Sequence, residues 1–148
     1  MSVPRPLPGL VIHYSYLWNS QARSGLTEGT KDRPCVIIAV GSEPSGDYRV
    51  SVLPITHATP QHAGDGVALP LPTKQRLGLD DQDSWVVVTE LNRFSWPGFD
   101  LRSIPNRPAW DCVYGFLPPK LFHQIKTRLM ASVRDQRLAV SRRDQSMS

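Results

Sequence analysis

Three residues whose side chains suit a phosphate lie at the outer ends of two apolar runs. Arg33 comes just before the run at 35–40, and Thr56 and His57 come just after the run at 50–55. A Gly/Ser/Pro/Asp-rich segment separates the runs, which predicts two antiparallel strands joined by a loop. The start of one antiparallel strand lies beside the end of the next, so we expect Arg33, Thr56 and His57 at one rim of the sheet.

The chemistry of these three groups is complementary. A guanidinium supplies positive charge and several donors, a hydroxyl supplies a neutral donor, and an imidazole exchanges a proton near neutral pH. Such a set can hold a phosphate and move a proton beside it. The alternative is an ordinary solvated strand end followed by a loop histidine, because strand ends and loops are commonly polar.

The composition indicates one globular domain with many turns. A chain of 148 residues, 40% apolar and 20% charged, can bury a real core. Its 14 prolines exclude long helices over most of the length and favour short strands. The net charge of +4 permits an anionic partner, although a basic solvated helix and tail after Pro118 would explain it equally well.

Several classes of protein are disfavoured. Cys35 and Cys112 form neither a disulfide framework nor a metal-ligand spacing. His57 and His62 lie in a loop without a nearby carboxylate or thiol cluster, so no metal and no other cofactor is expected. The N-terminus is broken by prolines, and no apolar run approaches the roughly 20 residues of a membrane span. We therefore expect a soluble, cytoplasmic protein that does not enter a membrane.

The segments around the candidate rim predict a mainly β chain. Large apolar residues alternate from Leu10 to Trp18, which predicts a first strand, and 19–31 has the composition of a loop. Pro54 cannot donate to a ladder, so the strand at 50–55 should bulge or lie at an edge there. Further short strands are expected at 67–69, at 85–89, within 96–105 and at 114–117, with a single helical turn within 72–79.

One helix is expected near the C-terminus. It begins at Pro118 or Pro119, where proline is favoured in the first turn. Its apolar stripe consists of Leu121, Phe122, Ile125, Leu129 and Val133. Short antiparallel strands avoid exposed edges by closing, so we predict a single domain built on a small curved β-barrel. Its parts are an irregular arm at 1–9, the barrel at 10–117, the helix at 118–137 and a frayed tail at 138–148.

The order of five segments resembles the PemK/MazF (Kid) family of toxins. They are G-L-V-I at 9–12, K-D-R-P at 31–34, L-P-I-T-H at 53–57, V-V-V-T-E-L-N-R at 86–93 and the final amphipathic helix. The resemblance covers roughly residues 9–133. It implies an SH3-like barrel with a C-terminal helix, a homodimer, and a metal-independent endoribonuclease neutralised by a cognate antitoxin. This chain differs at Leu91, where the family has a glutamine, and at Val88, where one branch has an arginine.

The resemblance also implies roles for individual residues. Arg33 and Thr56 fall on the family's phosphate-handling positions, and Glu90 falls on an acidic position with acid–base roles in some members. Cleavage of single-stranded RNA such as mRNA would proceed by attack of a ribose 2′-hydroxyl on the adjacent phosphodiester. We assign Arg33 to charge stabilisation, Thr56 to holding a phosphate oxygen, and Glu90 or His57 to the base.

Four further residues are predicted to bind RNA. Lys31 and Arg93 could hold flanking phosphates, and the loop pair Trp96 and Phe99 could stack on unpaired bases. For Glu90 the alternative is a salt bridge at the strand end with Arg93 or Lys31.

A non-catalytic protein is the second hypothesis. A toxin with an SH3-like fold, or a degenerate member of the family, could act by binding a protein target. The missing amide beside Glu90 favours this hypothesis, whereas the coincidence of Arg33, Thr56 and His57 at one rim favours the enzyme.

Overall fold

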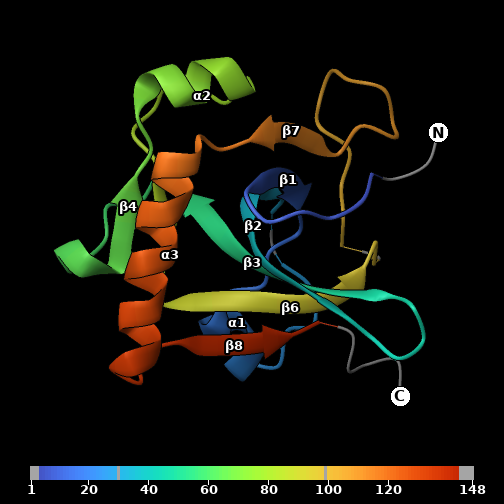
Figure 1. The fold of residues 1–148 in the computed structure, drawn as a ribbon, viewed down its shortest axis with the longest axis horizontal. Coiled ribbons are helices and arrows are strands. Elements are labelled where there is room, and N and C mark those ends of the chain that lie inside the picture. Colours follow the sequence, from blue (N-terminus) through green and yellow to red (C-terminus); the bar gives the residue numbers. More distant parts are fainter. Residues whose placement is uncertain (1–3, 30, 99, 144–148) are drawn as a thin grey trace.

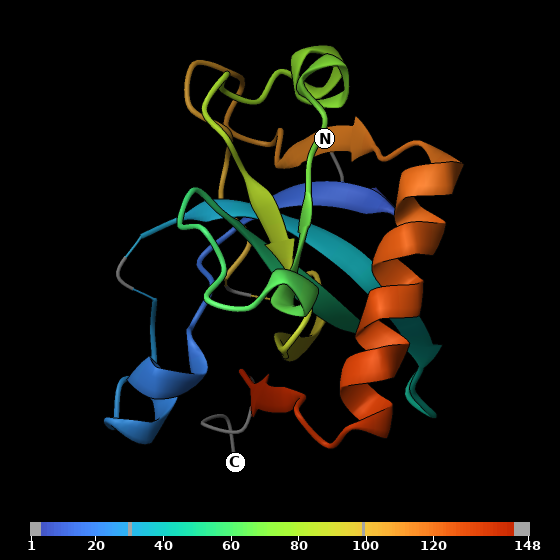
Figure 2. The same cartoon turned by 90° about the vertical axis from the view of Figure 1, so that its left-hand side faces the viewer.

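The computed structural model describes residues 4–29, 31–98 and 100–143. Its elements are β1 (Leu10–Tyr14), α1 (Asn19–Arg23), β2 (Arg33–Ser42), β3 (Tyr48–Thr56), the 3-10 helix η1 (Ala63–Asp65), β4 (Gly66–Ala68), α2 (Leu71–Leu77), β5 (Trp85–Val87), β6 (Glu90–Trp96), β7 (Val113–Phe116), α3 (Pro119–Arg134) and β8 (Ala139–Arg142). Within the described residues, the eight strands form one sheet beside which α3 runs (Figures 1 and 2). The prediction of a mainly β fold with a C-terminal α-helix is confirmed.

Strand β3 is the centre of the sheet. It pairs along one side with β2, and its other side is shared between β6 at 48–52 and β5 at Ile55 and Thr56. Pro54 falls where neither β6 nor β5 pairs with β3, so its missing N–H interrupts no ladder on that side. The irregularity in the β2–β3 ladder lies between Ile37 and Ala39, so of the two predicted alternatives at Pro54 the structure shows a local edge and not a bulge.

The sheet is buried on both faces. On β1 and β2, alternate residues belong to two different apolar clusters, as the two-residue period of a strand requires. One cluster is rich in aromatic residues and contains Leu10, Ile12, Tyr14, Tyr16, Cys35, Ile37, Val50, Val52, Phe94 and Trp96. The other cluster is aliphatic and lies under α3, which contributes Leu121, Ile125 and Leu129.

Four segments differ from the sequence-based prediction, and one is the strand expected within 96–105, where the described residues show only an isolated bridge from Leu101 to Tyr14. The expected strand at 85–89 ends at Val87, and the polar-looking Glu90–Trp96 segment forms a separate strand, β6. The loop at 19–31 contains the short helix α1. The expected frayed tail at 138–148 is wrong for Ala139–Arg142, because this segment forms β8 and pairs in parallel with β6. Backbone hydrogen bonds along β6 supply the order that side-chain periodicity alone does not predict.

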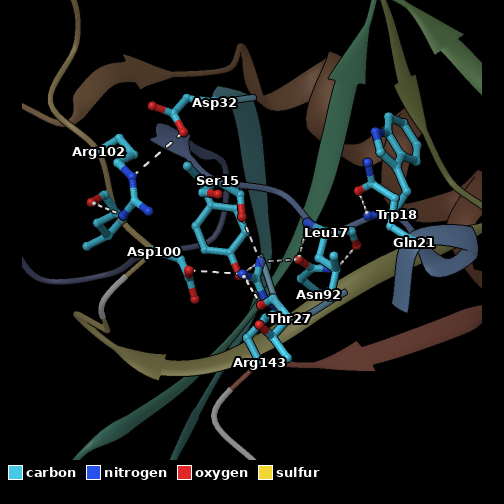
Figure 3. Close-up of polar contacts among 12 residues, drawn as sticks. Ser15, Leu17, Trp18, Gln21, Thr27, Asp32, Asn92, Asp100, Arg102 and Arg143 are labelled. Carbon is cyan, nitrogen blue, oxygen red and sulfur yellow. Dashed lines mark hydrogen bonds and ion pairs between the residues drawn. The ribbon is translucent and has the colours of Figure 1, made fainter. Parts of the chain in front are cut away.

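Arg143 follows β8 and joins four separate parts of the chain (Figure 3). Its side chain is 2% exposed. Its Nη1 donates to the Ser15 carbonyl (2.6 Å) and to Asn92 Oδ1 (3.1 Å). Its Nη2 donates to the Thr27 carbonyl (3.2 Å) and to Asp100 Oδ1 (2.9 Å). We call these five residues the Arg143 cluster.

Candidate active site

The strand register brings one end of three neighbouring strands together. Tyr14, at the end of β1, pairs with Arg33 at the start of β2, and Cys35 pairs with Pro54 near the end of β3. Arg33 therefore lies on the middle strand of the three. His13 lies on β1, to one side of it, and His57 directly follows β3 on the other side.

A cavity of about 270 Å³ opens at this edge. It is lined by His13, Lys31, Asp32, Arg33, Pro34, Ile55, His57, Lys74, Gly78, Leu79, Asp80, Ser84, Pro105 and Tyr114. This volume is near the lower end of the range of small-ligand pockets, about 300–1,000 Å³, and suits a phosphodiester with its adjoining sugar. Of the predicted residues, the structure brings Arg33, His57 and Lys31 to this cavity.

Arg33 is half-buried and has an unused donor. Its Nη1 donates weakly to the Ile55 carbonyl (3.4 Å), and its guanidinium lies 5.0 Å from the Trp18 ring centroid. Its buried Nε has no hydrogen-bond partner among the described residues. Burial lowers the pKa of the guanidinium, although an arginine stays charged in a protein. A buried donor without a partner costs free energy, so the described residues leave this guanidinium incompletely hydrogen-bonded.

His57 is held by a carboxylate that the sequence did not identify. His57 Nε2 lies 2.8 Å from Asp80 Oδ2. Lys74, which is 2% exposed, donates to Asp80 Oδ1 (3.0 Å), to Ser84 Oγ (2.7 Å) and to the Gln82 carbonyl. Burial raises the pKa of Asp80, but the hydrogen bonds from Lys74 and the Gln82 backbone and the charges of Lys74 and His57 outweigh it, and the net shift is downward. Asp80 is therefore an ionised acceptor that orients the imidazole.

The position of Asp80 depends on how α2 ends. Gly78 caps the helix with φ 76°, a left-handed conformation that glycine adopts without a Cβ penalty. The N–H of Leu79 then returns to the Lys74 carbonyl (2.9 Å). This turn carries Asp80 back over the Lys74 side chain. In the sequence, the signal for the ion pair between Lys74 and Asp80 is the helix-ending Gly78 that lies between them.

A second imidazole was also missed. His13 is 8% exposed, and its Nδ1 lies 2.9 Å from the Tyr114 hydroxyl. Burial lowers the pKa of His13, more than the nearby Asp32 raises it, and burial raises the pKa of Tyr114 to about 12. Neutral forms of both groups are thus favoured near neutral pH. No local pattern joins His13 to Tyr114, and the pairing of β1 with β7 places the two residues side by side.

Two predicted catalytic residues do not line the cavity. Glu90 Oε1 accepts from the Tyr16 hydroxyl (3.0 Å) and from the Asn19 backbone N–H (2.9 Å). Among the described residues these are its partners, and the alternative of a salt bridge with a basic side chain is not observed. Burial raises the pKa of Glu90 more than these two hydrogen bonds lower it. Thr56 Oγ1 accepts from the Ala58 N–H (3.1 Å), which closes a local turn.

The predicted RNA-binding residues are dispersed. Lys31 is exposed and lines the cavity. Arg93, on β6, donates from Nε to Ser51 Oγ (3.3 Å) and does not line the cavity. Trp96 is wrong as a stacking residue: it is 8% exposed, packs in the aromatic cluster and donates from Nε1 to the Pro4 carbonyl (3.0 Å), because strand β6 turns it inward. Phe99 lies outside the described residues.

The described part of the chain contains no group of three or more His, Cys, Asp or Glu side chains placed to hold a metal ion. Its helices include none with the length and apolar character needed to cross a membrane.

The fold and the cavity together define a small, mainly β protein with a cationic, histidine-lined cavity at one edge of its sheet. No protein-family model matches the sequence, and no curated protein matches it. A solved structure, an endoribonuclease in complex with its cognate antitoxin from a mycobacterial species, matches in fold with a TM-score of 0.56. The match covers 88% of this chain and 96% of that one at 15% sequence identity, and it shows a shared fold.

Proposed function

We propose that this protein is a cytoplasmic toxin of a toxin–antitoxin pair and cleaves single-stranded RNA as a metal-independent endoribonuclease. The observation that carries the proposal is that Arg33 and His57 line one cavity of phosphodiester size. The fold likeness to an endoribonuclease supports it from a separate direction. Both lines of support agree with the family resemblance of the sequence segments around Arg33 and Glu90.

The cavity offers what 2′-hydroxyl attack on a phosphodiester needs. The Arg33 guanidinium, with its unpartnered Nε, supplies positive charge for the crowded phosphorane. Lys31, at the exposed end of the cavity, suits a flanking phosphate. We assign proton transfer to His57 rather than to Glu90, because His57 lines the cavity and Glu90 does not. Thr56 Oγ1 accepts from the Ala58 N–H, which leaves its hydroxyl hydrogen to donate to a phosphate oxygen, and we keep Thr56 as the proposed phosphate ligand.

The proposed partners are mRNA as substrate, a cognate antitoxin and a second copy of the chain. The solved structure of similar fold contains its own cognate antitoxin, which supports an antitoxin here. Met130 and Val133, on the solvent side of α3, are 55% and 45% exposed and offer an apolar surface for a homodimer.

Cleavage of a long, mixed-sequence RNA by the purified protein in EDTA tests the proposal. We expect fragments with 2′,3′-cyclic phosphate and 5′-hydroxyl ends. Arg33→Ala should lower the rate at least about 100-fold, as expected for loss of a charge-stabilising donor. Arg134→Ala is the matched control, because Arg134 is an α3 residue with a side chain 76% exposed, and it should cleave like the wild type.

The non-catalytic hypothesis has one specific observation in its favour. Leu91, which stands where the family has an amide, is 4% exposed and belongs to the aliphatic cluster, so this position cannot contact RNA. A folded, antitoxin-free protein that leaves RNA intact would overturn the enzyme proposal. Binding of a protein target would then be the better proposal.

A further inference from the structure

The second histidine of the cavity has no part in the mechanism above. His13 and His57 reach the cavity from β1 and from the end of β3, the two strands that flank β2 and Arg33. Neighbouring strands lie about 4.8 Å apart, so the backbones of β1 and β3 are about 10 Å apart. That separation leaves room for one phosphodiester between two imidazoles.

Each imidazole is anchored through one ring nitrogen. Tyr114 holds His13 at Nδ1, and Asp80 holds His57 at Nε2. Within the described residues, no hydrogen bond engages His13 Nε2 or His57 Nδ1. The free nitrogens thus belong to two rings of fixed orientation on one cavity. A histidine whose other nitrogen is held by a second residue is a common arrangement where the free nitrogen acts on a ligand.

We propose that His13 and His57 are the base and the acid of the cleavage reaction, acting on opposite sides of a phosphodiester bound in the cavity that Arg33 also lines. This inference rests on the proposed function and adds His13 as a catalytic residue, with Tyr114 and Asp80 as positioning residues. In-line displacement needs the attacking and leaving oxygens on opposite sides of phosphorus, and the two flanking strands supply those sides.

The step balances with these two groups alone. His13 Nε2 takes the proton of the 2′-hydroxyl as the 2′-oxygen forms its bond to phosphorus. The bond from phosphorus to the 5′-oxygen breaks, and that oxygen takes the proton of His57 Nδ1. The products are a 2′,3′-cyclic phosphate and a 5′-hydroxyl, and proton exchange with water restores both imidazoles.

The surroundings set the direction of transfer. His13 is the buried ring and is favoured in its neutral form, which suits a base. His57 is 45% exposed, and its Nε2 lies 2.8 Å from the ionised Asp80, so its Nδ1 is the nitrogen available to a leaving oxygen. The charged and titratable groups near this pair are Asp32, Arg102 and Tyr114 around His13, and Asp80 and Lys74 around His57. Lys31 and Arg33 line the same cavity.

A change of leaving group distinguishes the two roles. After the wild-type protein has been used to map one cut site, an oligonucleotide is made in which sulfur replaces the bridging 5′-oxygen there. A thiol has a pKa of about 8.5, so the thiolate leaves without an acid. On ordinary RNA, His13→Asn and His57→Asn should each slow cleavage about 10²- to 10⁴-fold. On the sulfur substrate, His57→Asn should recover most of its rate and His13→Asn should not.

Controls keep the inference separate from folding and from the proposed function. His123→Asn removes an exposed histidine of α3 and should change nothing. Tyr114→Phe removes only the hydroxyl that holds His13, so it should shift the acidic limb of the pH–rate profile with a smaller loss of rate. A folded His13→Asn protein with unchanged rate and pH profile would overturn the inference and leave the proposed function intact. A wild-type protein that cleaves no RNA would overturn both.

Discussion

Burial destabilises the charged form of Glu90. Its carboxylate accepts two hydrogen bonds, from Tyr16 and Asn19, yet its pKa is raised because burial penalises the charged form. A carboxyl whose folded pKa lies above its unfolded value binds protons more tightly in the folded state. Its contribution to stability therefore falls as the pH rises above the ordinary value of 4.5.

We expect Glu90→Gln to be more stable than the wild type at pH 7, with the difference disappearing toward pH 4. Glutamine keeps the acceptor oxygen for Tyr16 and Asn19 but carries no charge to desolvate. Urea unfolding at the two pH values measures this. RNA cleavage should persist in the variant, because we assign proton transfer to the histidines. Lower stability at pH 7 would show that the carboxylate is favourably held, and loss of cleavage would return Glu90 to the site.

The sequence predicted the cavity residues that lie on or next to two consecutive paired strands. It did not predict those that come from segments further along the chain. Arg33 and His57 meet because antiparallel strands share an edge, a rule that needs only the two apolar runs. Asp80 arrives through the turn at Gly78, and Tyr114 through the pairing of β7 with β1. These are tertiary arrangements that no local pattern encodes.

At the scale of elements, α3 shows which buried residues of a helix the spacing of its apolar residues can predict. Its stripe at spacings of three to four predicted the buried face, and Leu121, Ile125 and Leu129 lie in the aliphatic cluster. Val133, the last residue of the predicted stripe, is 45% exposed, whereas the neighbouring Ser132 is 5% exposed, so the buried face of the final turn passes through Ser132 instead. Periodicity identifies a face of a helix, and the partner surface decides how much of that face is covered.

Ile125→Ala should cost about 2–5 kcal/mol of unfolding free energy, since Ile125 is fully buried and the sheet cannot close the space left. Lys126→Ala is the matched control on the same helix, because Lys126 is exposed, and it should change stability by less than about 0.5 kcal/mol. Urea unfolding of both variants provides the measurement. Similar costs for the two variants would contradict the burial of Ile125 in the aliphatic cluster.

Strands β6 and β8 are the part of the sheet that the sequence did not predict. β6 carries Asn92 and Arg93 within its apolar alternation, and these polar residues suggest a strand end. Asn92 is nevertheless fully buried, because its amide bonds the Leu17 backbone in both directions, at 3.0 and 2.8 Å. β8 has four residues and gains its order from pairing with β6. Long-range hydrogen bonds, which local composition does not report, stabilise both segments.

At the scale of the whole molecule, Arg143 fastens the C-terminal strand to distant segments. The Arg143 cluster gathers the chain after β1, the loop after α1, β6 and the segment at Asp100 (Figure 3). Asp100 is largely buried, and its ion pair with Arg143 has a Nη2–Oδ1 distance of 2.9 Å. The last described residue of the chain thus supports the aromatic side of the fold, where its guanidinium also lies 5.7 Å from the Tyr14 ring centroid.

Arg143→Met should lower the unfolding free energy by about 3–5 kcal/mol, because it leaves a buried carboxylate and several buried acceptors without their cation. Arg142→Met is the matched control: Arg142 is the exposed neighbour on β8, and its loss should cost less than about 0.5 kcal/mol. Urea unfolding compares the two, and hydrogen exchange should show faster opening of 139–142 in the first variant only. Equal stability of the two variants would mean that solvent replaces the guanidinium without cost, and that β8 is held by its pairing with β6 alone.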